Sequence, residues 1–181
     1  MFRQENVQLR PVWKTDLKNF LKWYNDPEVT CYLRMFFPIM EASEEKWIND
    51  LATIKHETDA VFVIEVKIKK RWVPIGSCGI HDINWHDRDA ELGMAIGEKK
   101  FQSNGYGTIA TRLLINYAFS QLNLHRVSSA AYAFNVRSLK MQERAGLRIE
   151  GCVRKSIYRN GEYHDKIIRG MLREEWEKMR K

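Results

Sequence analysis

A turn with two glycines, placed between a strand and a long helix, constrains the fold of this chain more than any other segment. The turn reads Gln102-Ser103-Asn104-Gly105-Tyr106-Gly107-Thr108. Glycine lets the backbone turn sharply and approach a ligand closely. Successive N–H groups at a helix N-terminus point outward, and an anion such as a pyrophosphate can bind there. The segment therefore predicts a strand–turn–helix unit that binds an anion.

Two familiar glycine motifs do not fit this turn. No Gly-Lys-[Ser/Thr] follows the glycines, so the turn is not a P-loop. The strand before it is not the first of the chain, which makes it a poor dinucleotide-binding fingerprint. From the loop alone, glycines that serve only the geometry of the turn remain an alternative. A side chain at Gly105 or Gly107 is expected both to block a phosphate and to strain the turn.

The hydrophobic periodicity along the chain gives the order of the elements. A strand at residues 7–13 precedes two amphipathic helices, for which Thr15 and Ser43 are the predicted N-caps. The later segments are strands at 61–67, 73–83 and 90–96, a helix at 105–122, a strand at 126–133, a helix at 135–145 and two strands around Asn160-Gly161, a hairpin signal. The order β-α-α-β-β-β-α-β-α-β-β predicts one domain over residues 1–181, with a mixed sheet and helices on its faces.

Composition restricts the classes of protein and the compartment. Hydrophobic residues make up 44% of the chain, which is typical of a globular protein. No apolar run approaches about 18–20 residues, so no membrane helix is expected. The three cysteines, Cys31, Cys78 and Cys152, form neither a disulfide framework nor a metal knuckle. With no secretory signal visible, the expected location is the cytoplasm.

The net charge of +7 favours an anionic partner. The basic residues are scattered and match no recognition helix or RNA-binding motif, which argues against nucleic acid and for a phosphorylated cofactor. The segment His81-Asp82-Ile83-Asn84-Trp85-His86-Asp87 contains residue types that bind metals. It is better interpreted as a hairpin turn with polar side chains, so no metal is expected.

The segment from Gln102 to Gly107 resembles the signature of the GNAT acetyltransferases, [Arg/Gln]-x-x-Gly-x-[Gly/Ala]. The predicted order of elements also resembles that superfamily over nearly the whole chain. Four further segments resemble its branch of ribosomal-protein alanine, polyamine and related N-acetyltransferases. They lie at residues 23–29, 135–138, 144–151 and 158–165. By analogy with that branch, a homodimer is suggested.

This resemblance implies a GNAT-like α/β fold with a mixed, largely antiparallel sheet, flanked by helices on both faces. The sheet should be splayed at the cofactor site, between residues 90–96 and 126–133. The implied cofactor is acetyl-CoA, as the acetyl donor. Its pantetheine arm should pair with the strand at 94–96, its pyrophosphate with the turn, and its thioester should lie near residues 135 and 138. The residues implied to bind it are Met94, Ala95, Ile96, Gln102, Ser103, Asn104, Gly105, Tyr106, Gly107, Thr108, Asn135 and Ser138.

The implied reaction is direct attack of a primary amine on the thioester. Ser138 is the candidate donor to the departing thiolate, and it can share a helix face with Asn135 and Gln142. The alternatives are a plain N-cap for Asn135 and a solvated serine for Ser138. Many GNAT enzymes, including those acting on polyamines, have a tyrosine acid where this chain has Gln142. A glutamine side chain cannot supply that proton.

Glu91 is the candidate base, acting directly or through water, because it lies on the strand that enters the cofactor site. The alternative is an ordinary surface carboxylate. Glu65 and His81 are weaker candidates. Donor groups for the oxyanion are expected on the backbone of residues 94–96.

The acceptor is expected to be an α-amino group of a protein or peptide, or a small-molecule amine. An α-amine, with a pKa of about 8, costs only about 1–1.5 kcal/mol to deprotonate at neutral pH. The positive chain should also repel a polycation. The alternative is a polyamine, which an acidic mouth made by Glu28, Glu41, Glu44 and Glu45 would attract. Alternatives of another class are a non-catalytic acyl-CoA-binding module and a ribosome-associated binding protein.

Overall fold

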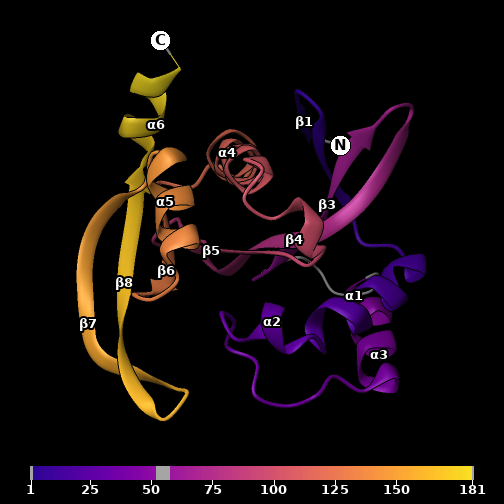
Figure 1. Ribbon diagram of the computed structural model, residues 1–181. Helices are drawn as coiled ribbons and strands as arrows, with labels where there is room; N and C mark the ends of the chain where they lie inside the picture. The colour runs from indigo at the N-terminus through magenta and orange to yellow at the C-terminus, as the bar shows by residue number, and fades with distance from the viewer. Residues whose placement is uncertain (1, 52–57, 181) are drawn as a thin grey trace.

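The strands pair edge to edge into one open, mostly antiparallel sheet (Figure 1). The computed structural model describes residues 2–51 and 58–180, and in them eight strands follow the order β1-β2-β3-β4-β5-β6-β8-β7. Only β5 and β6 run parallel within this described part. The strands are β1 (Phe2–Gln4), β2 (Val7–Pro11), β3 (Ala60–Ile68), β4 (Arg71–Asn84), β5 (Asp89–Ile96), β6 (Arg126–Tyr132), β7 (Arg148–Arg159) and β8 (Glu162–Leu172).

The helices follow the predicted order, with additions. They are α1 (Leu17–Tyr24), α2 (Pro27–Thr30), α3 (Glu41–Leu51), α4 (Tyr106–Ser120), α5 (Val136–Arg144) and α6 (Arg173–Met179), with short 3-10 helices η1 (Lys14–Asp16) and η2 (Lys99–Phe101). The mixed α/β fold with helices on both faces is confirmed. Strand β1 and the helices α2 and α6 were not predicted from the sequence. Asp26 caps α2 by accepting a hydrogen bond from the Glu28 N–H.

Two of the predicted helix caps are wrong. Thr15 lies inside η1, and α1 begins after Asp16. The Asp16 carboxylate is instead bonded to the Trp13 N–H and to Arg10. Ser43 lies within the first turn of α3, which begins at Glu41. In both cases the helix starts where the tertiary contacts of the preceding residues allow, one or two residues away from the residue with the best capping propensity.

Alternating side chains of β3 show which helices cover which face of the sheet. Val63 packs in a cluster with Phe20 and Trp23 of α1 and Ile48 of α3. Ile64, the next residue, belongs to the main core, which includes the buried face of α4. Successive side chains of a strand point to opposite faces, so α1 and α3 cover one face and α4 covers the other (Figure 1).

Strands β5 and β6 separate after a short paired stretch. Their parallel register runs from Asp89 opposite Arg126 to Glu91 opposite Ser128 and stops there. At this point the Ser129 hydroxyl donates to the Leu92 carbonyl over 2.9 Å, and the buried Gln142 amide donates to the Ser129 hydroxyl over 3.0 Å. The predicted splay of the sheet is therefore confirmed, and a chain of two hydrogen bonds ties α5, β6 and β5 at its vertex.

A group of buried charged side chains joins β2 and β3 on the face that carries α1. Arg10 bonds to the Asp16 carboxylate at 2.7 and 2.8 Å and to Glu65 at 2.8 Å. Gln8 donates to the other oxygen of Glu65 over 2.6 Å. Glu65, a weaker candidate base, is thus committed to a buried network and does not line the cavity described below.

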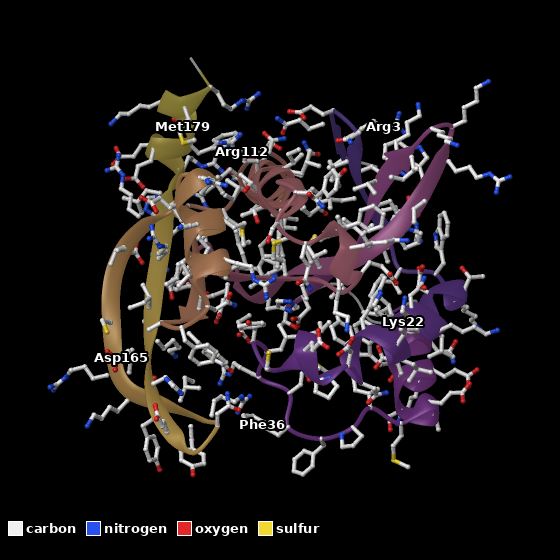
Figure 2. All side chains as sticks on the ribbon, in the orientation of Figure 1. Arg3, Lys22, Phe36, Arg112, Asp165 and Met179 are labelled. Atoms are coloured by element: carbon white, nitrogen blue, oxygen red, sulfur yellow. The ribbon has the colours of Figure 1, made fainter. Side chains whose placement is uncertain are left out.

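The segment after α2 is held against the β7–β8 hairpin. The Arg159 guanidinium lies over the Phe36 ring, 4.3 Å from its centroid, and its Nη2 donates to the Leu33 carbonyl over 2.8 Å. Figure 2 shows Phe36 at the end of the molecule where this hairpin turns. This contact bridges the two halves of the molecule across the splay.

Glu44, in the first turn of α3, is only 8% exposed, and burial raises the pKa of its carboxyl group. A raised pKa in the folded state means that its stabilising contribution is complete at low pH and is lost as pH rises through that pKa. We therefore expect Glu44→Gln to stabilise the protein at pH 7 but not at pH 4. Urea unfolding at both pH values measures this, with the exposed Glu45→Gln as the control for helix-dipole effects. An equal change at both pH values would contradict it.

Candidate active site

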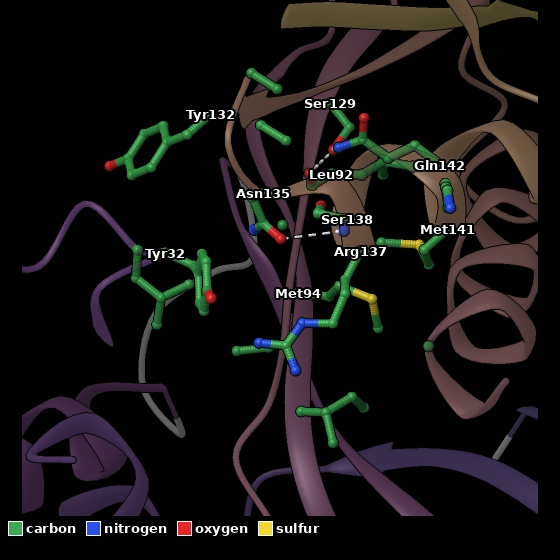
Figure 3. A pocket seen from close by; sticks show the side chains of 18 of the residues that line it. Tyr32, Leu92, Met94, Ser129, Tyr132, Asn135, Arg137, Ser138, Met141 and Gln142 are labelled. Carbon is green, nitrogen blue, oxygen red and sulfur yellow. Dashed lines mark hydrogen bonds between the residues drawn. The ribbon is translucent and has the colours of Figure 1, made fainter. Parts of the chain in front are cut away.

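A cavity of about 790 Å³ occupies the space between the separating strands β5 and β6. Its walls come from the segment after α2, from β4, β5, β6 and β8, from the glycine turn and from the start of α5. Figure 3 shows side chains from these segments turned toward one another. Most of the predicted site residues line it, namely Glu91, Met94, Ala95, Ile96, Gln102, Ser103, Gly105, Gly107, Thr108, Asn135 and Ser138.

Two predicted residues of the turn are not part of the lining. Asn104 is exposed, and its side-chain amide donates to the Lys100 carbonyl over 3.1 Å. The Tyr106 ring packs edge-on against Phe101. They shape the turn from outside the cavity.

The glycine turn presents free backbone amides to the cavity. Ser103 and Gly105 have left-handed backbone conformations, with φ of 62° and 84°. These angles reverse the chain just before α4. The first intrahelical amide bonds come from Thr108 and Ile109 to the Gly105 carbonyl. Within residues 2–51 and 58–180, the N–H groups of 103–107 have no acceptor, which is the arrangement that binds an anion.

The two glycines have different roles, which corrects the expectation for Gly107. Only Gly105 has a positive φ, so only there would a side chain strain the backbone. Gly107 lies inside α4, and a Cβ built on it would stand 3.5 Å from Met141 Cγ and 3.6 Å from Met94 Sδ, which are ordinary contacts. A side chain at Gly107 would narrow the cavity without straining the turn.

The free edge of β5 faces the cavity through alternate residues. The Leu92 carbonyl accepts from Ser129, and the Ile96 carbonyl accepts from the Gln102 side-chain amide over 2.8 Å. Backbone groups alternate in direction along a strand, so those of Met94 also point to this edge and those of Ala95 point toward β4. In this register the Ala95 backbone is directed away from the edge where a cofactor could pair, although Ala95 still lines the cavity.

Asn135 and Ser138 stand together at the start of α5. The Asn135 side-chain oxygen accepts from the Ser138 N–H over 3.1 Å, which is an N-cap bond (Figure 3). Asn135 therefore stabilises the helix start in addition to any contact with a cofactor. The Ser138 hydroxyl has no hydrogen-bond partner in the described part of the chain, so it is free to donate into the cavity.

Gln142 stands where the enzymes that this chain resembles have a tyrosine acid, and it is only 1% exposed. Its amide donates to Ser129 at the vertex of the splay, as Figure 3 shows. The residue thus fixes α5 to β6.

His81 and Glu91 form a row with Ser128 across β4, β5 and β6. Glu91 is the register partner of both His81 and Ser128, so the three side chains share one face of the sheet. In the described chain the Glu91 carboxylate has no hydrogen-bond or ion-pair partner. His81 Nδ1 bonds to Asp59 over 2.8 Å. Asp59, 22 residues away, was missed because no local pattern links a residue before one strand to the middle of the next.

The charges of the cavity are mostly positive. Five cationic side chains line it, namely Arg34, Arg137, Lys140, Arg144 and Lys166, whereas Glu91 is the one carboxylate among the described lining residues. None of the four glutamates proposed for an acidic mouth contributes. Glu28 pairs with Lys99 at 3.2 Å, and Glu44 is buried in α3.

The predicted turn after β4 is present, because the Asn84 side-chain oxygen accepts from the N–H groups of His86 and Asp87 at 3.0 Å. Over residues 2–51 and 58–180, no group of three or more His, Cys, Asp or Glu side chains could hold a metal ion.

In the same part of the chain, no helix is long and apolar enough to cross a bilayer.

Comparison with known proteins finds a family match over most of the chain. Residues 6–148 match the family model described as "Acetyltransferase (GNAT) domain". YdaF of Bacillus subtilis, whose name assigns it provisionally to the ribosomal N-acetyltransferases, is 39% identical over 56% of this chain, and the match spans only 55% of YdaF. The spermidine N(1)-acetyltransferase of Escherichia coli K12 is 27% identical over 90% of this chain and 83% of its own length.

Among solved structures, the spermidine N-acetyltransferase of Vibrio cholerae in complex with CoA and spermine superposes with a TM-score of 0.87. The comparison covers 96% of this chain and 99% of that one. At 21% sequence identity, this likeness shows a shared fold.

Proposed function

Because the chain belongs to the GNAT acetyltransferase family and is an N-acetyltransferase, we propose that it moves the acetyl group of acetyl-CoA to a primary amine. The observation that carries the proposal is one cavity with two chemically different ends. Unpaired backbone amides of the glycine turn lie at one end, and the unpaired Glu91 carboxylate lies at the other. The splay of β5 and β6 joins them.

The end of the cavity at the glycine turn suits a phosphorylated cofactor. The amides of residues 103–107 can hold the pyrophosphate at the N-terminus of α4. Three cations of α5, namely Arg137, Lys140 and Arg144, line the cavity and add attraction for its phosphates. The pantetheine arm would then follow the free edge of β5 and pair with the Met94 backbone as an added strand.

The residues around the thioester support direct transfer. The amine nitrogen attacks the carbonyl carbon, a C–N bond forms, and the C–S bond breaks. We propose the Met94 N–H as the donor to the oxyanion and the Ser138 hydroxyl as the donor to the departing sulfur. Glu91 attracts the acceptor and helps to deprotonate it. Asn135 holds the helix start that positions Ser138.

The acceptor we favour is an α-amino group of a peptide or protein, or a small moderately basic amine. The cations Arg34 and Lys166 line the same cavity as Glu91, and they disfavour a polycation. Gln142 also removes the acid used by polyamine enzymes. A polyamine is the second candidate, because proteins named as spermidine N-acetyltransferases appear among both the relatives and the solved structures.

Steady-state kinetics with acetyl-CoA test both acceptor classes. We expect short peptides with free N-terminal Ala or Ser, or a small α-amine, to have a kcat/KM at least equal to that of spermidine. Thiol release measures the rate. A value for spermidine more than tenfold above every other amine would select the polyamine, and no turnover with any amine would refute catalysis of amine acetylation.

A further inference from the structure

The proposed transfer requires a group that takes a proton from the acceptor ammonium, and a pair of side chains next to Glu91 has the geometry for it. His81 lines the cavity from β4, and Asp59 lies just before β3. His81 Nδ1 and Asp59 Oδ1 are 2.8 Å apart. The two side chains are 41% and 47% exposed, so the pair reaches solvent, and His81 is its member that lines the cavity.

Two glycines without side chains leave the space in which the His81 imidazole ring lies. A Cβ built on Gly79 would lie 2.6 Å from His81 Nε2, and one built on Gly93 would lie 3.3 Å from the same atom. Gly79 and Gly93 are register partners on β4 and β5. The ring therefore lies flat across both strands, with Nε2 beside Gly93, one residue before Met94. A side chain at Gly79 would push the ring out of this place.

The hydrogen bond to Asp59 leaves Nε2 available. When Nδ1 carries the proton and donates to the Asp59 carboxylate, the lone pair of the neutral ring is on Nε2. In residues 2–51 and 58–180, Nε2 has no partner. A carboxylate that holds one ring nitrogen fixes both the tautomer and the orientation of the imidazole, and it stabilises the imidazolium that forms.

We propose that His81 Nε2 is the proton acceptor of the acetyl-transfer reaction and that Asp59 is its positioning residue. The inference rests on the proposed function and deepens it. Glu91, the register partner of His81, helps by stabilising the imidazolium and by attracting the ammonium. The other charged groups that line the cavity are Arg34, Arg137, Lys140, Arg144 and Lys166.

In the proposed reaction, the acceptor ammonium first gives one proton to His81 Nε2 and becomes a neutral amine. Its nitrogen lone pair attacks the thioester carbon, and the C–S electron pair leaves with sulfur. The nitrogen then loses its second proton, which passes through the Ser138 hydroxyl to the sulfur, so the thiolate leaves as a thiol. The imidazolium releases its proton to water and is neutral for the next cycle.

The test compares two acceptors of different basicity at pH 7. An alkylamine with a pKa of about 10 depends more on a base than an α-amine with a pKa of about 8. We expect His81→Gln to lower kcat/KM about 100-fold for the alkylamine and about tenfold for an α-amino peptide. The KM for acetyl-CoA should stay unchanged. Asp59→Asn should lower kcat for the same alkylamine about tenfold, again without a change in that KM.

The matched control is His86→Gln, because His86 is exposed in the turn after β4 and does not line the cavity. If His81→Gln does not fold, Gly79→Ala keeps the imidazole and displaces it, and it should cost kcat about tenfold. A loss below threefold, or the same loss for both acceptors, overturns the role of His81 while the acetyltransferase proposal stands. A wild-type protein that acetylates no amine overturns both.

Discussion

Replacing Arg10 with methionine should cost about 3–5 kcal/mol of the free energy of unfolding. Arg10 is 2% exposed, and its guanidinium is bonded to two buried carboxylates, those of Asp16 and Glu65. Burial lowers the pKa of Arg10, but the hydrogen bonds to these carboxylates outweigh it and raise the pKa overall, so the cation persists. Methionine would fill much of the space and leave both buried negative charges without a cation, with only the Trp13 N–H and the Gln8 amide still donating to them.

Urea unfolding measures this loss, and Arg154→Met is the matched control. Arg154 is exposed on β7, so the same substitution there should stay within about 0.5 kcal/mol. Combining Arg10→Met with Asp16→Asn and Glu65→Gln should recover part of the stability, because the uncompensated charges are gone. A loss for Arg10→Met within 1 kcal/mol of the control would mean that water reaches these carboxylates.

Gly107→Val should weaken the binding of acetyl-CoA at least tenfold, or about 1.4 kcal/mol. A Cβ at this position points between Met141 and Met94, which line the cavity beside the amides of the turn. The two methyl groups of valine would extend beyond that Cβ into the space proposed for the cofactor. Gly107 has no left-handed backbone, so the turn itself should keep its shape.

Calorimetric titration with CoA measures the affinity, and circular dichroism verifies the fold. Gly151→Val is the control, because a Cβ at Gly151 has no atom within 4 Å and the residue lies on β7, outside the cavity. Wild-type affinity in a correctly folded Gly107→Val protein would show that the cofactor does not approach this part of α4.

Much of the fold could be predicted from local patterns. The period of the apolar residues gave the order of the main strands and helices, and the Asn160-Gly161 pair marked the β7–β8 hairpin. The errors are the missed short elements β1, α2 and α6 and the positions at which α1 and α3 begin. The Asp16 carboxylate accepts a hydrogen bond from the Arg10 side chain, and no local rule for helix caps includes such a partner.

The site was predictable where one short segment makes it, and not where distant segments meet. Residues 102–108 could be predicted as an anion-binding turn because all the features on which that prediction rests are contiguous. The partnership of His81 with Asp59 depends on the pairing of β3 with β4, which brings residues 22 positions apart into contact. The direction of the Ala95 backbone depends on strand register, and a single sequence does not determine it.

The strand order β6-β8-β7 also has a consequence for the chain as it leaves the ribosome. β8, and not β7, pairs with β6, so one edge of β6 stays open until residues 162–172 have been made. An open strand edge can pair with another chain, and newly made proteins are most exposed to this hazard during synthesis. The residues that tie the vertex between β5 and β6, Ser129 and Gln142, precede β8 in the chain. The cavity wall that carries Lys166 is therefore among the last parts of the site to be synthesised.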